Sequence, residues 1–262
     1  MAGWESIAVR DAQKRSRNSM SLLAQLAESA WLEFISLTVS LTAVIGYWYW
    51  INHRTGTNKR GQLSTPAQNR LIRQWWVQTL DNQTGAEILA VQTLRNAIMV
   101  STALASATML ILLGVFTLIA QRQELVAISN TLLGVPLISL DPQTVGLKLL
   151  LLAALQISAF FCFLTAIRYY GHISFLVAMP TALRHAMQAS QIATPPNGAI
   201  SHETQPDPLP NYLQRAGSAY AIGIRIMIYS IPLFSWLLGN LALLVATALT
   251  VSIMYWTDRA PH

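Results

Sequence analysis

The sequence predicts an all-α integral membrane protein, built as a bundle of four transmembrane helices, the last one kinked, with amphipathic helices at the membrane surface. Composition gives the first two reasons: hydrophobic residues make up 53% of the chain and charged residues only 11%. Soluble domains average about a quarter charged residues. The third reason is that four stretches of roughly 20 mainly apolar residues are each long enough to cross a hydrocarbon core about 30 Å thick.

The four predicted spans lie at about residues 30–51, 97–120, 147–167 and 233–256. The first closes with the aromatic run Tyr47–Trp50, which is typical of a membrane–water interface. Ahead of the fourth, an apolar stretch at residues 220–231 is interrupted by Arg225 and closed by Pro232. Residues 220–256 are too long for one span and too short for two. Because proline removes a helical hydrogen bond, we predict a short helix that leads into a kinked span.

Three further segments complete the predicted organisation. Residues 1–29 form a basic, amphipathic lead-in, which is not a signal peptide because Glu28 interrupts it and no small-residue cleavage site follows. Residues 30–256 form one membrane domain, and residues 194–210 within it form a flexible proline-rich linker. Residues 257–262 form a short tail. The weakly apolar stretch 125–140 is too interrupted by Gly134 and Pro136 to count as a fifth span.

An interfacial amphipathic helix is predicted in the first connection. Ser64 or Thr65 can cap it, and Pro66 occupies its first position, which is a favourable start signal. Six residues then share one helical stripe: Leu71, Ile72, Trp75, Trp76, Thr79 and Leu80. This stripe either packs against the cytoplasmic end of the bundle or contacts lipid directly.

The distribution of basic residues predicts the topology. Residues 52–95 carry six Lys or Arg and residues 168–225 carry four, whereas residues 121–146 carry only Arg122. The positive-inside rule therefore places loops 52–95 and 168–225 in the cytoplasm. With four spans, both termini face the opposite side. We expect the inner (cell) membrane of a bacterium as the location.

Polar residues at the mouth of the second span are candidates for a site. Gln92, Arg95 and Asn96 fall on one helical face, which continues inward through Met99, Ala103 and Ser106. Polar groups at membrane depth are costly and are rarely left without partners. Two readings stay open: helix packing through small residues with amide bonds across the interface, or a polar binding site on the same face.

Arginines at three span boundaries sharpen this choice. Arg95, Arg168 and Arg225 all fall on the predicted cytoplasmic side, with Asn96, Tyr169 and His172 nearby in the sequence. Each arginine alone could reach the lipid headgroups at little cost. If the three converge, they form a cationic layer that favours phosphate or carboxylate, such as an anionic phospholipid headgroup or a small anion.

Other chemistries have little support in the sequence. The histidines lack metal-ligand spacing and no acidic cluster accompanies them, so no metal is expected. The single cysteine, Cys162, excludes an intramolecular disulfide and lies among aromatic residues, where it is unreactive. No phosphate-binding loop or other cofactor motif occurs, and no residue is assigned a catalytic role. The basic residues are dispersed, which argues against nucleic acid as a partner.

Three blocks of sequence resemble the membrane protein family called domain of unknown function 599. They are Val91–Met99 with Leu104–Ser106, Lys148 with Phe160–Phe163 and Ile167–His172, and a third block that contains Arg215–Ser218, Gly223–Arg225, Tyr229, Pro232, Trp236 and Gly239. The resemblance covers roughly residues 40–256 and implies a multi-span helical membrane protein. It carries no activity with it. Arg215 and Tyr229 of the third block join the candidate ligand-binding residues.

Three functions follow as hypotheses. The first is a non-catalytic accessory or structural component that packs with itself or with other membrane subunits and binds anionic lipid. The second is a small transporter or channel for an anionic or amphiphilic solute. The third is a membrane enzyme that acts on an anionic lipid, with His172 as the one evident general base. The first leads because it needs no feature that the sequence lacks.

Overall fold

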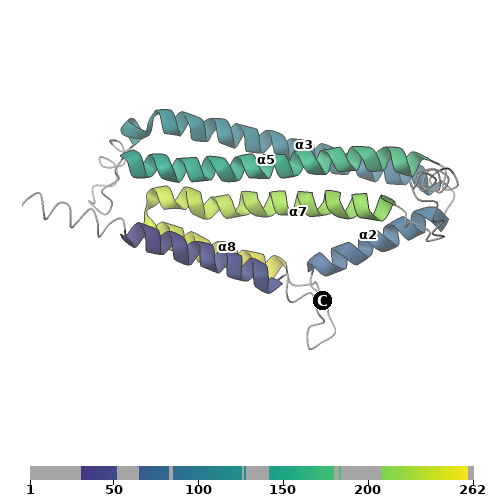
Figure 1. The fold of residues 1–262 in the computed structure, drawn as a ribbon, viewed down its shortest axis with the longest axis horizontal. Helices are drawn as coiled ribbons and strands as arrows, with labels where there is room; N and C mark the ends of the chain where they lie inside the picture. The colour runs from purple at the N-terminus through teal and green to yellow at the C-terminus, as the bar shows by residue number, and fades with distance from the viewer. Residues whose placement is uncertain are drawn as a thin grey trace, which may run out of the picture.

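The computed structural model describes residues 31–51, 65–82, 85–125, 127, 142–179, 183 and 208–258, and within them it contains helices and no strands (Figure 1). The predicted lead-in at residues 1–29, residues 194–207 of the predicted linker, the stretch 128–140 and the last four residues lie outside this described part. The predicted all-helical class is confirmed for the described residues.

Among the described residues, five helices, and not four, are long and apolar enough to span a membrane. They are an N-terminal helix at Trp31–Ile51, α3 at Ala86–Ala120, α5 at Pro142–Ala178, α7 at Pro208–Ser235 and α8 at Asn240–Thr257. A short 3₁₀ helix, η1, joins the last two at Trp236–Leu238. Residues 208–257 therefore contain two helices that are each long enough to cross, because α7 begins well before the apolar stretch that starts at residue 220.

The break between α7 and α8 occurs at Gly239 and not at the proline. Pro232 lies inside α7, which continues for three more residues. Gly239 has φ 125° and ψ 171°, a backbone conformation that residues with a side chain rarely adopt. Its N–H donates to the Trp236 carbonyl oxygen at 3.1 Å. The glycine thus allows the chain to leave η1 and reverse into α8. The predicted kinked span is replaced by a helical hairpin.

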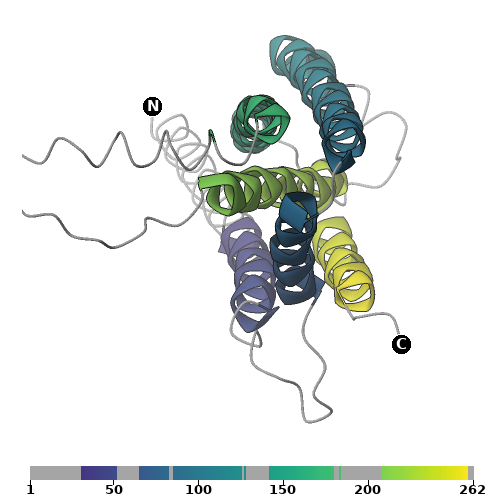
Figure 2. The ribbon, with the colours of Figure 1, turned by 90° about the vertical axis from the view of Figure 1, so that its right-hand side faces the viewer.

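The spans alternate in direction and form two layers around α7. α5 packs along both α3 and α7, and these two contacts are the most extensive between the helices described. Viewed end-on, α7 lies between the α3–α5 pair and a second group made of the N-terminal helix, α2 (Thr65–Asn82) and α8 (Figure 2). The N-terminal helix and α8 meet at their carboxyl ends, where the Trp50 and Tyr255 ring centroids are 5.8 Å apart.

The fifth helix changes the predicted topology. Glu33, near the start of the N-terminal helix, pairs with Lys148 near the start of α5, whereas Asp258 at the end of α8 contacts Tyr47 near the other end of the N-terminal helix. The two ends of the described chain therefore lie at opposite ends of the bundle. The prediction that both termini share one side rested on four spans, whereas the described residues contain five helices of spanning length.

Differences in helix length create a step on one side of the bundle. The N-terminal helix has 21 residues and α8 has 18, which corresponds to about 31 and 27 Å, close to the thickness of a hydrocarbon core. α3 and α5 have 35 and 37 residues and reach about 52 and 55 Å. The long helices continue beyond the carboxyl ends of the N-terminal helix and α8, and α2 lies against this projecting part (Figure 1).

The predicted amphipathic helix is present as α2, and its stripe divides between two environments. Val77 is buried, and Trp76 and Leu80 pack against the same core cluster. Ile72 and Trp75 are exposed, at 58% and 63%. Both alternatives that the sequence left open therefore describe part of this helix: one edge packs on the bundle, and the other is free to contact lipid.

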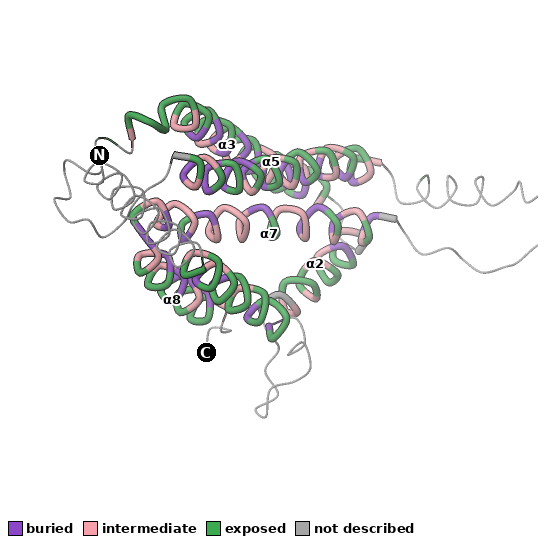
Figure 3. The backbone as a smooth tube through the Cα atoms, turned by 60° about the vertical axis from the view of Figure 1, so that its left-hand side comes forward, coloured by how far each residue is buried: buried purple, intermediate pink, exposed green. Residues whose placement is uncertain are grey.

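Small and aliphatic side chains fill the core along α3, α5 and α7. One cluster at the projecting end joins Leu94 of α3 to Ile173 of α5 and Leu213 of α7. A central cluster contains Ala105, Ala159 and Phe163, and a third lies at the far ends of α3 and α5. Buried residues face between the helices and exposed ones face outward (Figure 3). The outward faces are themselves apolar, as expected for a surface solvated by lipid.

Candidate functional site

The polar stripe at the mouth of the second span faces away from the bundle. Gln92, Arg95 and Asn96 are all exposed, as are Met99, Ala103 and Ser106 farther along the same face. The buried face of α3 is a different one, made by Ala90, Leu94, Ser101, Ala105, Thr108, Leu112 and Val115. Apolar packing decided the rotation of this helix, so the Gln92 stripe lines no interior site within this chain.

The predicted residues of α5 lie on its projecting end. Arg168 and His172 are exposed, whereas Tyr169 is half-buried. The rings of Tyr169 and His172 lie 5.8 and 6.4 Å from the ring of Tyr212 in α7. These residues therefore form an aromatic contact between α5 and α7, and they do not meet Arg225.

Arg225 pairs with Asp258, which a four-span topology would place at the opposite side of the membrane. Its Nη2 lies 3.2 Å from Asp258 Oδ1 and 3.1 Å from Oδ2, and the Tyr47 hydroxyl donates to Oδ2 at 2.7 Å. Asp258 reaches this position because α8 crosses as a separate span. The neighbouring Tyr229 hydroxyl is buried with no hydrogen-bond partner in the described part of the chain.

A cavity of about 560 Å³ lies at the step where the N-terminal helix and α8 end. We call it the interface cavity. Its polar lining comes from α2, α7 and α8: Asn69, Arg70, Arg73, Gln214, Ser218, Arg225 and Asp258. Apolar side chains that include Trp48, Ile224 and Met254 line the rest. The cavity therefore combines a charged portion with an apolar portion, at the level where the N-terminal helix and α8 end.

Arg73 is a half-buried charge in the lining of this cavity. Its guanidinium lies directly against the backbone of Gly217, where any added Cβ would overlap it. Its polar contact is a long one, from Nη1 to Gln214 Oε1 at 3.5 Å, and no carboxylate of the described residues pairs with it. Burial, together with the nearby positive charge of Arg70, lowers the pKa of Arg73 below its usual range. Its charge is thus partly desolvated and has no counter-ion among the described residues.

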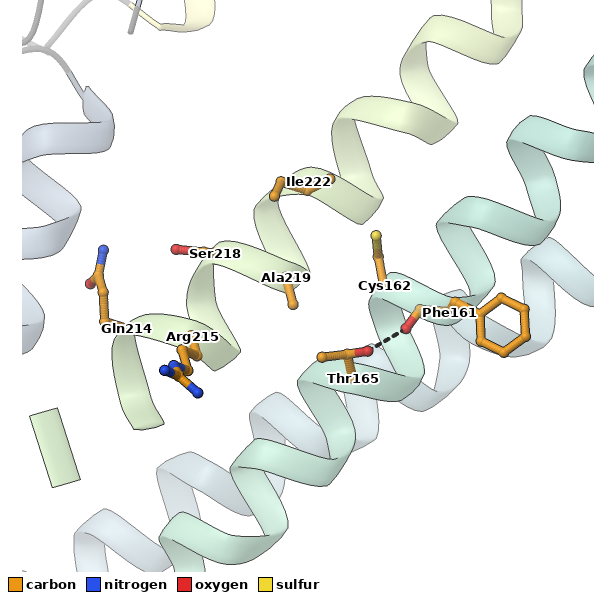
Figure 4. Close-up of a pocket in the computed structure, with 8 residues that line it drawn as sticks. All are labelled: Phe161, Cys162, Thr165, Gln214, Arg215, Ser218, Ala219 and Ile222. Carbon is orange, nitrogen blue, oxygen red and sulfur yellow. Dashed lines mark hydrogen bonds between the residues drawn. The ribbon is translucent and has the colours of Figure 1, made fainter. Parts of the chain in front are cut away.

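A second cavity, which we call the lateral groove, lies between α5 and α7 and has a volume of about 420 Å³ (Figure 4). Phe161, Cys162 and Thr165 line it from α5, and Arg215 and Ala219 are among its α7 residues. The rest of its α7 wall is shared with the interface cavity and consists of Gln214, Ser218 and Ile222. Arg215 is the single charged residue in the lining of this groove.

A buried ion pair marks the opposite end of the bundle. Lys148 Nζ lies 2.7 Å from Glu33 Oε1, with 1% of the lysine side chain exposed and 22% of the glutamate side chain. The same ammonium lies 4.7 Å from the centre of the Trp236 ring. This pair was not predicted from the sequence, although two observations indicate it. Lys148 is the one lysine of α5, and Glu33 is the one acid between residues 31 and 51.

Halfway along the spans, a polar pair connects α5 to α7. Gln156 Nε2 donates to Ser230 Oγ at 3.0 Å, and both residues are buried. The Gln156 Oε1 atom and the Ser40 hydroxyl are buried with no partner among the described residues. The described residues contain no group of three or more His, Cys, Asp or Glu side chains placed to hold a metal ion.

Comparison with known proteins identifies the family. A family model described as "Protein of unknown function, DUF599" matches residues 35–262. No curated protein and no solved structure matches the chain. The match covers most of the chain and confirms the resemblance seen in the sequence blocks. The chain therefore belongs to the DUF599 family of proteins of unknown function.

Proposed function

We propose that this protein is a non-catalytic membrane component that binds the headgroup of an anionic lipid in the interface cavity. The observation that carries the proposal is Arg73, a partly desolvated guanidinium that faces a cavity and has no carboxylate partner among the described residues. A buried charge without a counter-ion is costly, so a bound anion would stabilise this arrangement. Guanidinium groups bind phosphate through paired hydrogen bonds.

The charge of the cavity supports an anionic ligand. Its lining contains three arginines, Arg70, Arg73 and Arg225, and one aspartate, Asp258, which leaves two positive charges in excess. Asp258 already accepts hydrogen bonds from Arg225 and Tyr47. The excess charge therefore belongs to the two α2 arginines, and a phosphate group is complementary to it.

The position of the cavity supports a lipid as the source of that anion. It lies where two spans of membrane-matching length end, and the exposed Ile72 and Trp75 of α2 are placed to contact the membrane surface. The basic residues of loops 52–95 and 168–225 favour the cytoplasmic face of a bacterial inner membrane for this end. Exposed Arg95, Arg168 and Arg215 would attract anionic lipids to it.

Self-association belongs to the same proposal. The outward face of α3 carries Gln92 and Asn96 at one end and the small residues Ala103 and Ser106 farther in. In lipid, small residues allow helices to approach closely and amides bond between them. This face is available to another copy or another membrane subunit.

Replacing Arg73 with alanine tests lipid binding. Purified protein is reconstituted in nanodiscs of phosphatidylglycerol and phosphatidylcholine, released into mild detergent and analysed by native mass spectrometry. We expect the affinity for phosphatidylglycerol to fall about 10- to 100-fold, since hydrogen bonds to charged groups contribute about 1.5–3 kcal/mol. Less of this lipid should therefore be retained. Arg122→Ala is the matched control, because Arg122 is exposed at the opposite end of the bundle and lines neither cavity. Equal retention in Arg73→Ala and the unmodified protein would refute the proposal.

Transport of an anionic or amphiphilic solute is the second candidate function. It is favoured by the buried Ser40 hydroxyl, Gln156 Oε1 and Tyr229 hydroxyl, which lack partners among the described residues within the apolar spans. Such groups are satisfied if water or a polar solute passes between the helices. The enzyme hypothesis gains no comparable support, since His172 lines neither cavity.

Gln156→Leu distinguishes transport from packing. If the spans enclose a hydrated path, this change should abolish flux of a fluorescent anion into proteoliposomes while the protein remains folded. If the amide serves packing, flux will be absent from both proteins and stability will change by about 1 kcal/mol, the usual net contribution of one hydrogen bond. Glu124→Gln, at an exposed site, is the control.

A further inference from the structure

The interface cavity and the lateral groove lie on two sides of one ridge of α7. The residues that they share, Gln214, Ser218 and Ile222, are spaced by four and therefore form one stripe of the helix. Ile222 is 49% exposed, so the ridge is open at this end, whereas Arg73 of α2 lies against Gln214 at the other end. A molecule placed over this ridge would contact both cavities at once.

Polarity changes along the ridge in the direction expected for a lipid. Two arginines flank Gln214 at its amino-terminal end: Arg73 contacts the Gln214 amide, and Arg215 is the next residue in the chain. Toward Ile222 the groove becomes apolar, with Ala219 and Phe161, and the cavity presents Ile222, Ile224 and Met254 beside the Arg225–Asp258 ion pair, which is neutral as a pair. Ile222 follows Arg215 by seven positions, which corresponds to about 10 Å along the helix. The charged end lies on the side where α2 packs, at the membrane surface.

We infer that the bound ligand is a phospholipid with two acyl chains, which straddles α7. Its anionic headgroup lies over Gln214 between Arg73 and Arg215, one chain enters the lateral groove, and the other follows the apolar wall of the interface cavity. This inference rests on the proposed function and adds the class of lipid. A free phosphate or a single-chain lipid could use the arginines, but it would leave one of the two apolar walls uncovered.

Cys162 provides a native reporter for the chain in the lateral groove. It is the single cysteine of the sequence, and although its aromatic neighbours in the sequence predict an unreactive thiol, it is half-buried and lines the groove opposite Ala219, where a maleimide can reach it (Figure 4). In delipidated protein in detergent, we expect phosphatidylglycerol to slow the reaction of Cys162 with N-ethylmaleimide. Lysophosphatidylglycerol, which has one chain, and inorganic phosphate should give no such protection.

Two substitutions separate the headgroup from the chain. Arg215→Ala should weaken retention of phosphatidylglycerol about tenfold, because a charge-assisted contact is lost. Ala219→Phe should fill the groove and lower retention of phosphatidylglycerol to that of the lysolipid, without removing any charge. Ala154→Phe, at an exposed position of α5 that lines neither cavity, controls for the added bulk.

The outcomes distinguish this inference from the function on which it rests. If Arg73→Ala loses lipid but one-chain and two-chain lipids bind equally and Cys162 is never protected, the two-chain inference is overturned and the proposed function stands. If Arg73→Ala retains phosphatidylglycerol as the unmodified protein does, both are overturned. Protection of Cys162 by the two-chain lipid alone, lost in Arg215→Ala, supports both.

Discussion

Replacing Glu33 with glutamine is expected to lower the free energy of unfolding by about 3 kcal/mol, since it leaves the Lys148 ammonium buried without its counter-charge. Lys148 is 1% exposed, and its remaining favourable contact is the Trp236 ring at 4.7 Å, which compensates only in part. Thermal unfolding in detergent, followed by circular dichroism, measures the change. The loss should be seen as a lower midpoint for Glu33→Gln.

The double variant Glu33→Gln with Lys148→Met shows whether the loss comes from the uncompensated charge. Replacing a buried ion pair by apolar groups of similar volume is often neutral or stabilising. The double variant should therefore recover most of the stability that the single variant loses. Glu124→Gln removes an exposed acid of the same side of the bundle and should leave the midpoint unchanged. A single variant as stable as the unmodified protein would show that the pair does not hold the N-terminal helix to α5.

Asp258→Asn is expected to change lipid binding and stability in opposite directions. The variant removes the one negative charge of the interface cavity, so the excess of positive charge rises and retention of phosphatidylglycerol should increase about tenfold, equivalent to about 1.4 kcal/mol. Stability should fall by about 2 kcal/mol, because Arg225 loses its carboxylate partner and the bond from Tyr47 weakens. Native mass spectrometry and thermal unfolding of the same preparations measure the two effects.

Tyr47→Phe is the matched control for this variant. It removes one hydrogen bond to Asp258 and leaves every charge in place, so stability should fall by about 1 kcal/mol while lipid retention stays constant. If Tyr47→Phe raised retention as much as Asp258→Asn, loosening of the helix ends would explain the gain. If Asp258→Asn lowered retention, the aspartate would help to bind the ligand and would not oppose it.

The contact between Arg225 and Asp258 shows why the sequence alone misplaced part of the candidate site. The number of crossings sets the side on which every later residue lies. If residues 220–256 form one kinked span, as the sequence predicts, Asp258 lies at the opposite end of that span from Arg225. Gly239 instead ends η1 and begins α8, which brings the acid back to the level of Tyr47. One glycine conformation therefore decided whether Arg225 had a partner.

Helix rotation explains the other differences. Spacing correctly placed Gln92, Arg95 and Asn96 on one face of a helix, but spacing does not say what that face contacts. In a soluble protein, an apolar face indicates the core, whereas here both the core and the lipid are apolar. Small residues on α3 therefore gave no means to separate the buried stripe through Ser101 and Ala105 from the exposed one through Ala103 and Ser106.

The sequence by itself determined the helical membrane class, the family and the existence of α2, because hydropathy, span length and start signals act locally along the chain. The tertiary structure decided the number of spans, the partner of Arg225 and the identity of the cavity that now carries the proposal. In the sequence, Arg73 is only one of the six basic residues of the segment 52–95. It becomes the central cation because α2 packs into the step left by two short spans, and this juxtaposition depends on lengths and contacts of helices far apart in the sequence.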